Sequence, residues 1–138
     1  MQTNISTTDI FSLLGQPVRI QIILIIHKSE ACVCHMEAIL GIRQATISQH
    51  LMTLRDAGLV KANRQGRNIF YKLANPDLYQ AVVKVAEAAG VNETELQHYA
   101  HSPVENCPCP KCNPGIDPEL SCRKMKSKKT LKILQSGN

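Results

Sequence analysis

The sequence predicts a mainly α-helical fold that carries one small β-hairpin. Apolar residues recur at helical spacing through much of residues 8 to 57 and again from 78 to 89. Residues 59 to 64 and 67 to 73 are instead typical of two strands around a Gln65-Gly66 turn. The chain of 138 residues is 43% hydrophobic but only 4% aromatic, so its core is thin and a partner subunit is expected to help stabilise it.

Capping residues place the first two helices. A short helix is expected over residues 8 to 14, with Thr7 or Thr8 as its cap and Gly15 at its end. Pro17 opens a second helix, because proline is favoured at the first helical position. The buried side of this helix is predicted from its apolar residues, which are Ile20, Ile23, Leu24 and Ile26.

A helix-turn-helix unit is predicted next. Ser29 is placed to cap a third helix that continues through EACVCHMEAIL, and Gly41 then makes a turn. A fourth helix is expected over residues 43 to 57. Its buried face is apolar at i, i+4 and i+7, with Ile47, Leu51 and Leu54. Two helices joined by a short turn with glycine, followed by a hairpin, predict a winged helix-turn-helix.

A further helix is expected after Asn75-Pro76. Its apolar positions recur at a spacing that makes a narrow seam, and they are Leu78, Val82, Val85 and Ala89. Such a seam is more typical of helix pairing than of a broad globular face.

Charge and polarity indicate double-stranded DNA as the partner of this unit. Residues 123 to 132 hold 6 of the 16 Lys/Arg, so the net charge of +5 is weak evidence by itself. Within residues 41 to 72, however, six Lys/Arg face a single acid, Asp56. Polar side chains on the fourth helix suit base edges, and the arginines at the hairpin tip suit phosphates or the minor groove. The predicted DNA-binding residues are Arg43, Gln44, Thr46, Ser48, Gln49, His50, Arg64 and Arg67.

The alternative is a solvated helix and a basic turn in another kind of small domain. His50 is the weakest member of the set, because it is equally able to pack against the second helix.

The first cysteine pair is interpreted as a sensor. The N-terminus lacks the basic region of a signal peptide and no apolar run is long enough to span a bilayer, so we expect a cytoplasmic protein without a membrane partner. Thiols stay reduced there, which favours metal ligands or redox sensors over disulfides. On the third predicted helix, Cys32 and Cys34 point about 200° apart, so binding one ion requires that turn to open. The alternative is that one or both are small buried apolar residues.

A second group of thiols lies in a Pro-rich segment. Cys107, Cys109 and Cys112 form C-x-C-x-x-C, and Cys122 follows ten residues later. These thiols can converge on one thiophilic ion, and a separate structural zinc that uses all four is the alternative. We expect residues 1 to 102 to form the DNA-binding and dimerisation domain, 103 to 122 a metal-binding segment, and 123 to 138 a basic disordered tail.

Two stretches resemble a known family. The segments LLGQPVRIQIILII and CVCHMEAILGIRQATISQHLMTLRDAGLVKANRQGRNIFYKL resemble the ArsR/SmtB family of arsenic- and metal-sensing repressors, over roughly residues 8 to 90. The resemblance implies a homodimeric winged-helix repressor whose first and last helices form the dimer interface. It also implies that inducer binding lowers operator affinity and that the family's cysteine box corresponds to Cys32 and Cys34.

The sequence departs from the family pattern at three points. Many members have serine where this chain has Arg43, and some arsenic sensors have a third cysteine where it has Glu37. The acid-and-histidine pattern that zinc sensors carry on the last helix is absent from NPDLYQAVVKVAEAAG. The last two departures bear on which ligand is sensed.

We therefore interpret the chain as a dimeric repressor that binds an inverted-repeat operator and releases it when thiolates bind a thiophilic ion. As(III), Sb(III), Cd and Pb are the leading inducers, with Zn as a further candidate. One alternative is a repressor that senses thiol redox state or persulfide. Another is a metal-sequestering protein whose helix-turn-helix binds a protein. No nucleophile–base pair, phosphate loop or cofactor motif is present, so we expect neither an enzyme nor a catalytic cofactor.

Overall fold

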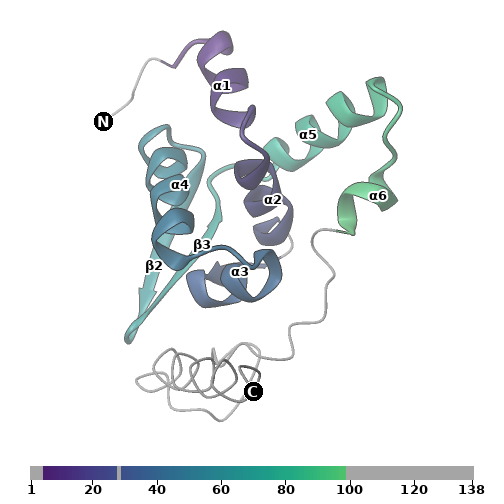
Figure 1. The fold of residues 1–138 in the computed structure, drawn as a ribbon. Helices are drawn as coiled ribbons and strands as arrows, with labels where there is room; N and C mark the ends of the chain where they lie inside the picture. Colours follow the sequence, from purple (N-terminus) through teal and green to yellow (C-terminus); the bar gives the residue numbers. More distant parts are fainter. Residues whose placement is uncertain (1–4, 28, 99–138) are drawn as a thin grey trace.

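A computed structural model describes residues 5–27 and 29–98 (Figure 1). Within them the chain forms α1 (Thr7–Leu14), α2 (Pro17–Ile26), β1 (Ala31–Cys32), α3 (Val33–Leu40), α4 (Gln44–Asp56), β2 (Val60–Gln65), β3 (Asn68–Leu73), α5 (Asp77–Ala88) and α6 (Glu93–Gln97). The three strands form one antiparallel sheet in the order β1-β3-β2. The predicted mainly helical fold with a β-hairpin is confirmed, and the hairpin gains a third strand.

Helix α2 lies at the centre of the hydrophobic core. Its last five residues, Ile22 to Ile26, are all buried. A helix that is apolar on every side must be covered on every side, and α2 contacts α1, α4, β3 and α5. The residues that α3 and α4 add to this core are Met36, Ile47, Leu51 and Leu54.

A capping box begins α1 one residue earlier than predicted. The Ser6 hydroxyl accepts a hydrogen bond from the Asp9 amide, and the Asp9 carboxylate accepts one from the Ser6 amide. Hydrogen bonds from Ser6 lower the pKa of Asp9. The cap is therefore Ser6, whereas the sequence favours Thr7 or Thr8, because only Ser6 has Asp9 three residues after it.

The third helix begins later than predicted. Ala31 and Cys32 form strand β1, which pairs with Tyr71 and Phe70 of β3. Cys32 is the N-cap of α3, with extended backbone angles (φ −89°, ψ 167°). The helix therefore starts at Val33. Ala31 and Cys32 make their backbone hydrogen bonds with the edge of β3 and not within a helix.

The turn of the hairpin also lies one residue later than predicted. Gln65 still pairs with Asn68, so Gly66 and Arg67 form a two-residue loop. Gly66 has a φ of 64°, in the left-handed region that glycine adopts without strain. Two-residue hairpin loops require such a value at their first position. This hairpin is the wing of the fold and projects away from the helices (Figure 1).

Helix α6, which the sequence did not predict, packs against α5. The Asn92 side chain caps α6 by accepting a hydrogen bond of 2.9 Å from the Glu95 amide. The Tyr79 hydroxyl donates to Glu93 at 2.9 Å and accepts from the Gln97 amide at 3.1 Å. Burial raises the pKa of Tyr79; the bond from Gln97 lowers it, and the bond to Glu93 and its charge raise it.

The predicted pairing seam on α5 is divided between two environments. Val82 is buried in the core of its own protomer. In contrast, Leu78 is half-buried, Val85 is 55% exposed and Ala89 is exposed. The other buried residues of α5 are Tyr79 and Val83. The ring of Tyr79 stacks on His27 at the end of α2, with centroids 3.6 Å apart.

Within the described residues no single helix has the length and hydropathy needed to cross a bilayer, although α1 and α2 together, with a 90° bend between them, meet those criteria.

A side-chain hydrogen bond connects α2 to α4. The Arg19 guanidinium donates through Nε to Nδ1 of His50 at 3.1 Å, and through Nη1 to the Leu13 carbonyl at 3.1 Å. Because arginine is only a donor, the His50 ring must be neutral at Nδ1 to accept. Burial, and after it the charge of Arg19, lower the pKa of His50 below its ordinary value of 6.5.

We expect His50 to make stability depend on pH. Since its pKa is lower in the folded than in the unfolded chain, its contribution is fully present above 6.5 and is lost as pH falls toward the folded value. The variant His50→Gln keeps a carbonyl acceptor for Arg19 but does not titrate. Between about pH 8 and pH 5, thermal unfolding should show the wild type losing stability relative to this variant.

His98→Gln is the matched control, because His98 is an exposed histidine after α6 and lies outside this contact. It should follow the wild type at every pH. The same pH dependence in His50→Gln and the wild type would contradict a titrating Arg19–His50 bond.

Candidate functional site

The outward face of α4 carries only part of the predicted DNA-binding set. Arg43, at the N-cap, and Ser48 and Gln49 are exposed. The remaining three residues predicted on this helix, Gln44, Thr46 and His50, are half-buried at its flanks. His50 is engaged by Arg19, as the alternative interpretation of this residue expected.

Two apolar residues on the same face were not among the DNA-binding residues predicted from the sequence. Ala45 is exposed, and Met52 is 63% exposed although it is a large apolar side chain. Together with Ser48 and Gln49 they occupy positions i, i+3, i+4 and i+7, which share one face of a helix. Apolar side chains contact the methyl group of thymine in the major groove. The helical spacing from Ser48 and Gln49 is the sequence signal that identifies them.

The wing and its neighbours supply positive charge. Arg64 lies in β2, paired with Ile69, and Arg67 lies in the turn itself. The six cations predicted for this region are all exposed, and they are Arg43, Arg55, Lys61, Arg64, Arg67 and Lys72. A polar helix face next to an exposed basic hairpin has the polarity and charge that a DNA duplex requires.

Cys32 and Cys34 lie on two different elements, so the predicted divergence of both along one helix is wrong. Cys32 ends β1 and Cys34 is in the first turn of α3, because the backbone changes from extended to helical at Val33. Both thiols are buried, with 2% and 3% of their surface exposed. Access for an ion therefore requires movement at the junction between β1 and α3.

The cysteine pair is connected to both elements of the DNA-binding surface. The Gln44 amide on α4 donates to the sulfur of Cys34 at 3.6 Å. On the other side, Cys32 pairs with Phe70 of β3 in the wing sheet. Gln65, near the wing tip, donates to the carboxylate of Glu30 at 3.2 Å, just before β1. Cys34 therefore contacts α4, and Cys32 contacts a strand of the wing hairpin.

The described residues contain two of the six candidate thiol ligands. Within residues 5–27 and 29–98, no three His, Cys, Asp or Glu side chains come together as a metal-binding group. Glu37 and His35 are both half-buried on α3. The predicted ligands Cys107, Cys109, Cys112 and Cys122 lie outside the described residues, as do the predicted segments 103 to 122 and 123 to 138.

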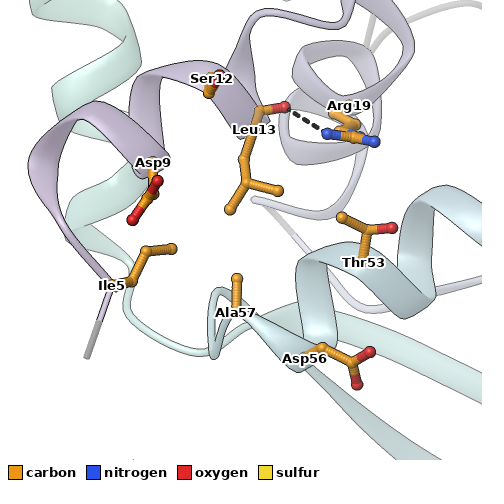
Figure 2. Close-up of a pocket in the computed structure, with 8 residues that line it drawn as sticks. All are labelled: Ile5, Asp9, Ser12, Leu13, Arg19, Thr53, Asp56 and Ala57. Atoms are coloured by element: carbon orange, nitrogen blue, oxygen red, sulfur yellow. Dashed lines mark hydrogen bonds between the residues drawn. The ribbon is translucent and has the colours of Figure 1, made fainter. Parts of the chain in front are cut away.

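A cavity of about 520 Å³ lies between α1, α2 and the end of α4 (Figure 2). The Leu13 side chain points into it towards Ala57, and the Leu13 carbonyl accepts the bond from Arg19. None of the predicted site residues lines it. Its charged lining residues are Asp9, Arg19 and Asp56. Asp9 is hydrogen-bonded to Ser6 and Arg19 to His50, and we assign the cavity no ligand.

Comparisons with known proteins agree with this geometry. The family model for "Bacterial regulatory protein, arsR family" matches residues 16–62. The HTH-type transcriptional repressor SmtB of Mycobacterium tuberculosis is 37% identical over 82 residues, which cover 59% of this chain and 61% of that repressor. This chain thus spans less than two thirds of that relative's length.

Two solved structures share the fold. The transcriptional repressor BigR from Xylella fastidiosa has a TM-score of 0.54 and 31% identity, covering 59% of this chain and 83% of BigR. A homodimeric winged helix-turn-helix DNA-binding domain from Mycobacterium bovis, described as a possible ArsR-family regulator, has a TM-score of 0.54 and 26% identity. That comparison covers 68% of this chain and 84% of the domain. The fold, the matched segment and these relatives together show that the chain belongs to the ArsR/SmtB family of winged helix-turn-helix regulators.

Proposed function

We propose that this chain is a homodimeric transcriptional repressor that binds operator DNA and releases it when cysteine thiolates bind a thiophilic ion. The observation that carries the proposal is the position of the thiol pair. Cys34 accepts a hydrogen bond from α4, the helix that we propose faces DNA, and Cys32 pairs with β3, one of the two strands of the wing. An ion at this pair therefore acts on both DNA-binding elements. We also propose that the protein is cytoplasmic.

DNA binding is proposed to divide between the two elements. Base contacts come from the exposed face of α4, where Ser48, Gln49 and Met52 project, and from Gln44 at its beginning. Phosphate contacts come from Arg64 and Arg67 of the wing. The relatives SmtB and BigR are both named as transcriptional repressors, which supports repression as the output.

The effector is proposed to be a soft ion, because the candidate donors are sulfur. Thiolates favour arsenite-, antimonite-, cadmium- and lead-like ions over magnesium or calcium, and zinc is also compatible. Cys32 and Cys34 supply two ligands, whereas such ions take three or four. Glu37 is a hard ligand and a poor third partner. We propose that Cys107, Cys109 or Cys112 completes the site, in the same subunit or in the partner, with a separate zinc site as the alternative.

A dimer is proposed through the first helix and the last long helix. Phe11 on α1 is 57% exposed and Val85 on α5 is 55% exposed. Each is a large apolar side chain that a single protomer leaves in contact with water. Both helices lie at the end of the molecule away from the wing tip (Figure 1). A two-fold dimer then presents two copies of α4 to an inverted repeat, with half-site centres about 34 Å apart. The homodimeric state named for the Mycobacterium bovis domain supports this arrangement.

Replacing both wing arginines should test the DNA-binding surface. The double variant Arg64→Ala/Arg67→Ala should bind all duplexes more weakly, and its salt dependence should fall by about 0.9 in slope for each phosphate that the wing no longer neutralises. Fluorescence anisotropy over a range of salt concentrations measures both effects. Lys84→Ala removes a cation from α5 and should leave the slope unchanged. If the double variant keeps the wild-type slope, the wing does not contact phosphates.

Release by ions should depend on the thiol pair and on the C-terminal cysteines. Titration of the protein on its own promoter DNA with arsenite, antimonite, Cd²⁺ or Pb²⁺ should release the DNA, and Mg²⁺ should not. Cys32→Ser or Cys34→Ser should abolish release while the metal-free protein still binds DNA. A chain ending at residue 102 should need a much higher ion concentration than the full chain to release the DNA.

The outcomes separate the alternatives. A truncated chain that responds at the wild-type ion concentration would exclude the C-terminal cysteines from the sensor. Release by an oxidant in metal-free buffer, with no response to any ion, would support a thiol redox sensor instead. Failure of the metal-free protein to retard any promoter fragment would refute the repressor itself.

A charge on the apolar side of α5 should weaken the dimer. Val85→Glu places a carboxylate in the proposed interface and should raise the dimer dissociation constant about tenfold or more, because burying an unpaired charge is unfavourable. Analytical ultracentrifugation measures the change. Gln80→Glu is the matched control, since it adds the same charge at an exposed polar position of the same helix. Equal dissociation constants for the two variants would place the interface elsewhere.

A further inference from the structure

The side-chain amide of Gln44 connects the thiol pair to the DNA-facing helix. Its Nε2 donates to Sγ of Cys34 at 3.6 Å, in a partly buried position. Gln44 is the first residue of α4, and Cys34 is the second residue of α3. The bond therefore crosses the turn of the helix-turn-helix. Its donor is a residue proposed to read DNA, and its acceptor is a residue proposed to bind the effector.

A glutamine amide is able to make this bond and read a base at the same time. Its NH₂ group has two hydrogens, and its carbonyl oxygen is an acceptor. One hydrogen lies on the same side as the oxygen, and these two groups form the pair of bonds that glutamine makes with adenine. The other hydrogen points away from that pair. In Gln44 this second hydrogen is available for the sulfur of Cys34.

The sulfur determines which way the amide faces. The terminal torsion of glutamine has a broad, nearly two-fold distribution, so an unsupported amide presents its oxygen and its nitrogen to DNA in either order. A thiolate only accepts hydrogen bonds, and in this structure Cys34 Sγ is the acceptor and Gln44 Nε2 the donor, so the NH₂ side faces Cys34. Because Cys34 is 3% exposed, water does not compete for this position.

We propose that Cys34 is a positioning residue for base recognition by Gln44. Its uncomplexed sulfur holds the amide of Gln44 in the orientation that pairs with adenine. Capture of that sulfur by an ion draws it away from the amide and leaves Gln44 without this support. The effector then lowers the preference for operator over other sequences, in addition to any general loss of DNA affinity. The part of this inference that concerns ions rests on the proposed function.

A double-mutant cycle without any ion tests the positioning role. The full chain and its variants Gln44→Ala, Cys34→Ala and the double variant are titrated with their promoter duplex and with a random-sequence duplex, in reductant and chelator. Cys34→Ala should weaken binding to the promoter about three- to tenfold with little change on random DNA. In the Gln44→Ala background, Cys34→Ala should have no further effect.

Two matched variants separate positioning from packing. Cys34→Ser keeps an acceptor for Gln44 and should retain most of the preference for promoter DNA. Val33→Ala removes apolar packing at the position next to Cys34, in the first turn of α3, and should leave that preference at the wild-type value. Circular dichroism confirms that each variant is folded. If Cys34→Ala weakens promoter binding by the same factor in both backgrounds, or weakens both duplexes alike, the positioning role is refuted.

The ion response is tested separately. Arsenite should reduce the promoter-to-random affinity ratio of the wild type and change it much less in Gln44→Ala. Because the cycle contains no ion, a wild type that fails to release DNA with any ion refutes the sensor and leaves the positioning role standing. A failed cycle with intact release refutes only the positioning role.

Discussion

The fold depends on the burial of one helix on all sides. The last five residues of α2 are each buried, and each such side chain contributes about 1.5–3 kcal/mol relative to exposure. Together they contribute an amount comparable to the whole net stability of a typical domain, about 5–15 kcal/mol. Helices α1, α4 and α5 and strand β3 must therefore stay against α2. The helix proposed to face DNA and the helix proposed to form the dimer are consequently parts of one core.

The thiol pair lies at the edge of this rigid core, where two kinds of structure meet. Cys32 belongs to a strand only two residues long, and Cys34 to the first turn of a short helix. Few backbone hydrogen bonds hold so short a strand, so we expect this junction to open at a lower free energy than the core around it. Its neighbours Phe70 and Met36 are fully buried and hold the surroundings in place. A local change is therefore possible here without unfolding the domain.

The sequence predicts those parts of the fold that depend on local patterns. Ile47, Leu51 and Leu54 are all buried as their spacing indicates, and Gly41 ends α3 with a φ of 68°. Strand β1 was not predictable in this way, because it exists only through its pairing with β3, far along the chain. The cap of α6 is present in the sequence at Asn92 and Glu95, but a helix of five residues gives no periodic signal.

The candidate site shows the same division. Residue types and charge identify α4 and the wing, whereas the contacts of individual side chains depend on tertiary packing. Nothing local in the sequence indicates that Gln44 turns towards Cys34, and packing of His50 against the second helix was only one of two interpretations, since both partners come from other helices. The roles of Cys107, Cys109, Cys112 and Cys122 stay predictions, because these residues lie outside the described chain.

The junction between β1 and α3 also constrains how this protein can evolve. Only Val33 separates the residue that ends the strand from the residue in the first helical turn. An insertion between Cys32 and Cys34 would separate the end of β1 from the first turn of α3 and change the position of one thiol relative to the other. A deletion would remove the residue at which the backbone turns into the helix. New effector preferences should therefore arise by substitution of flanking residues, while the spacing of the two cysteines stays invariant among functional descendants.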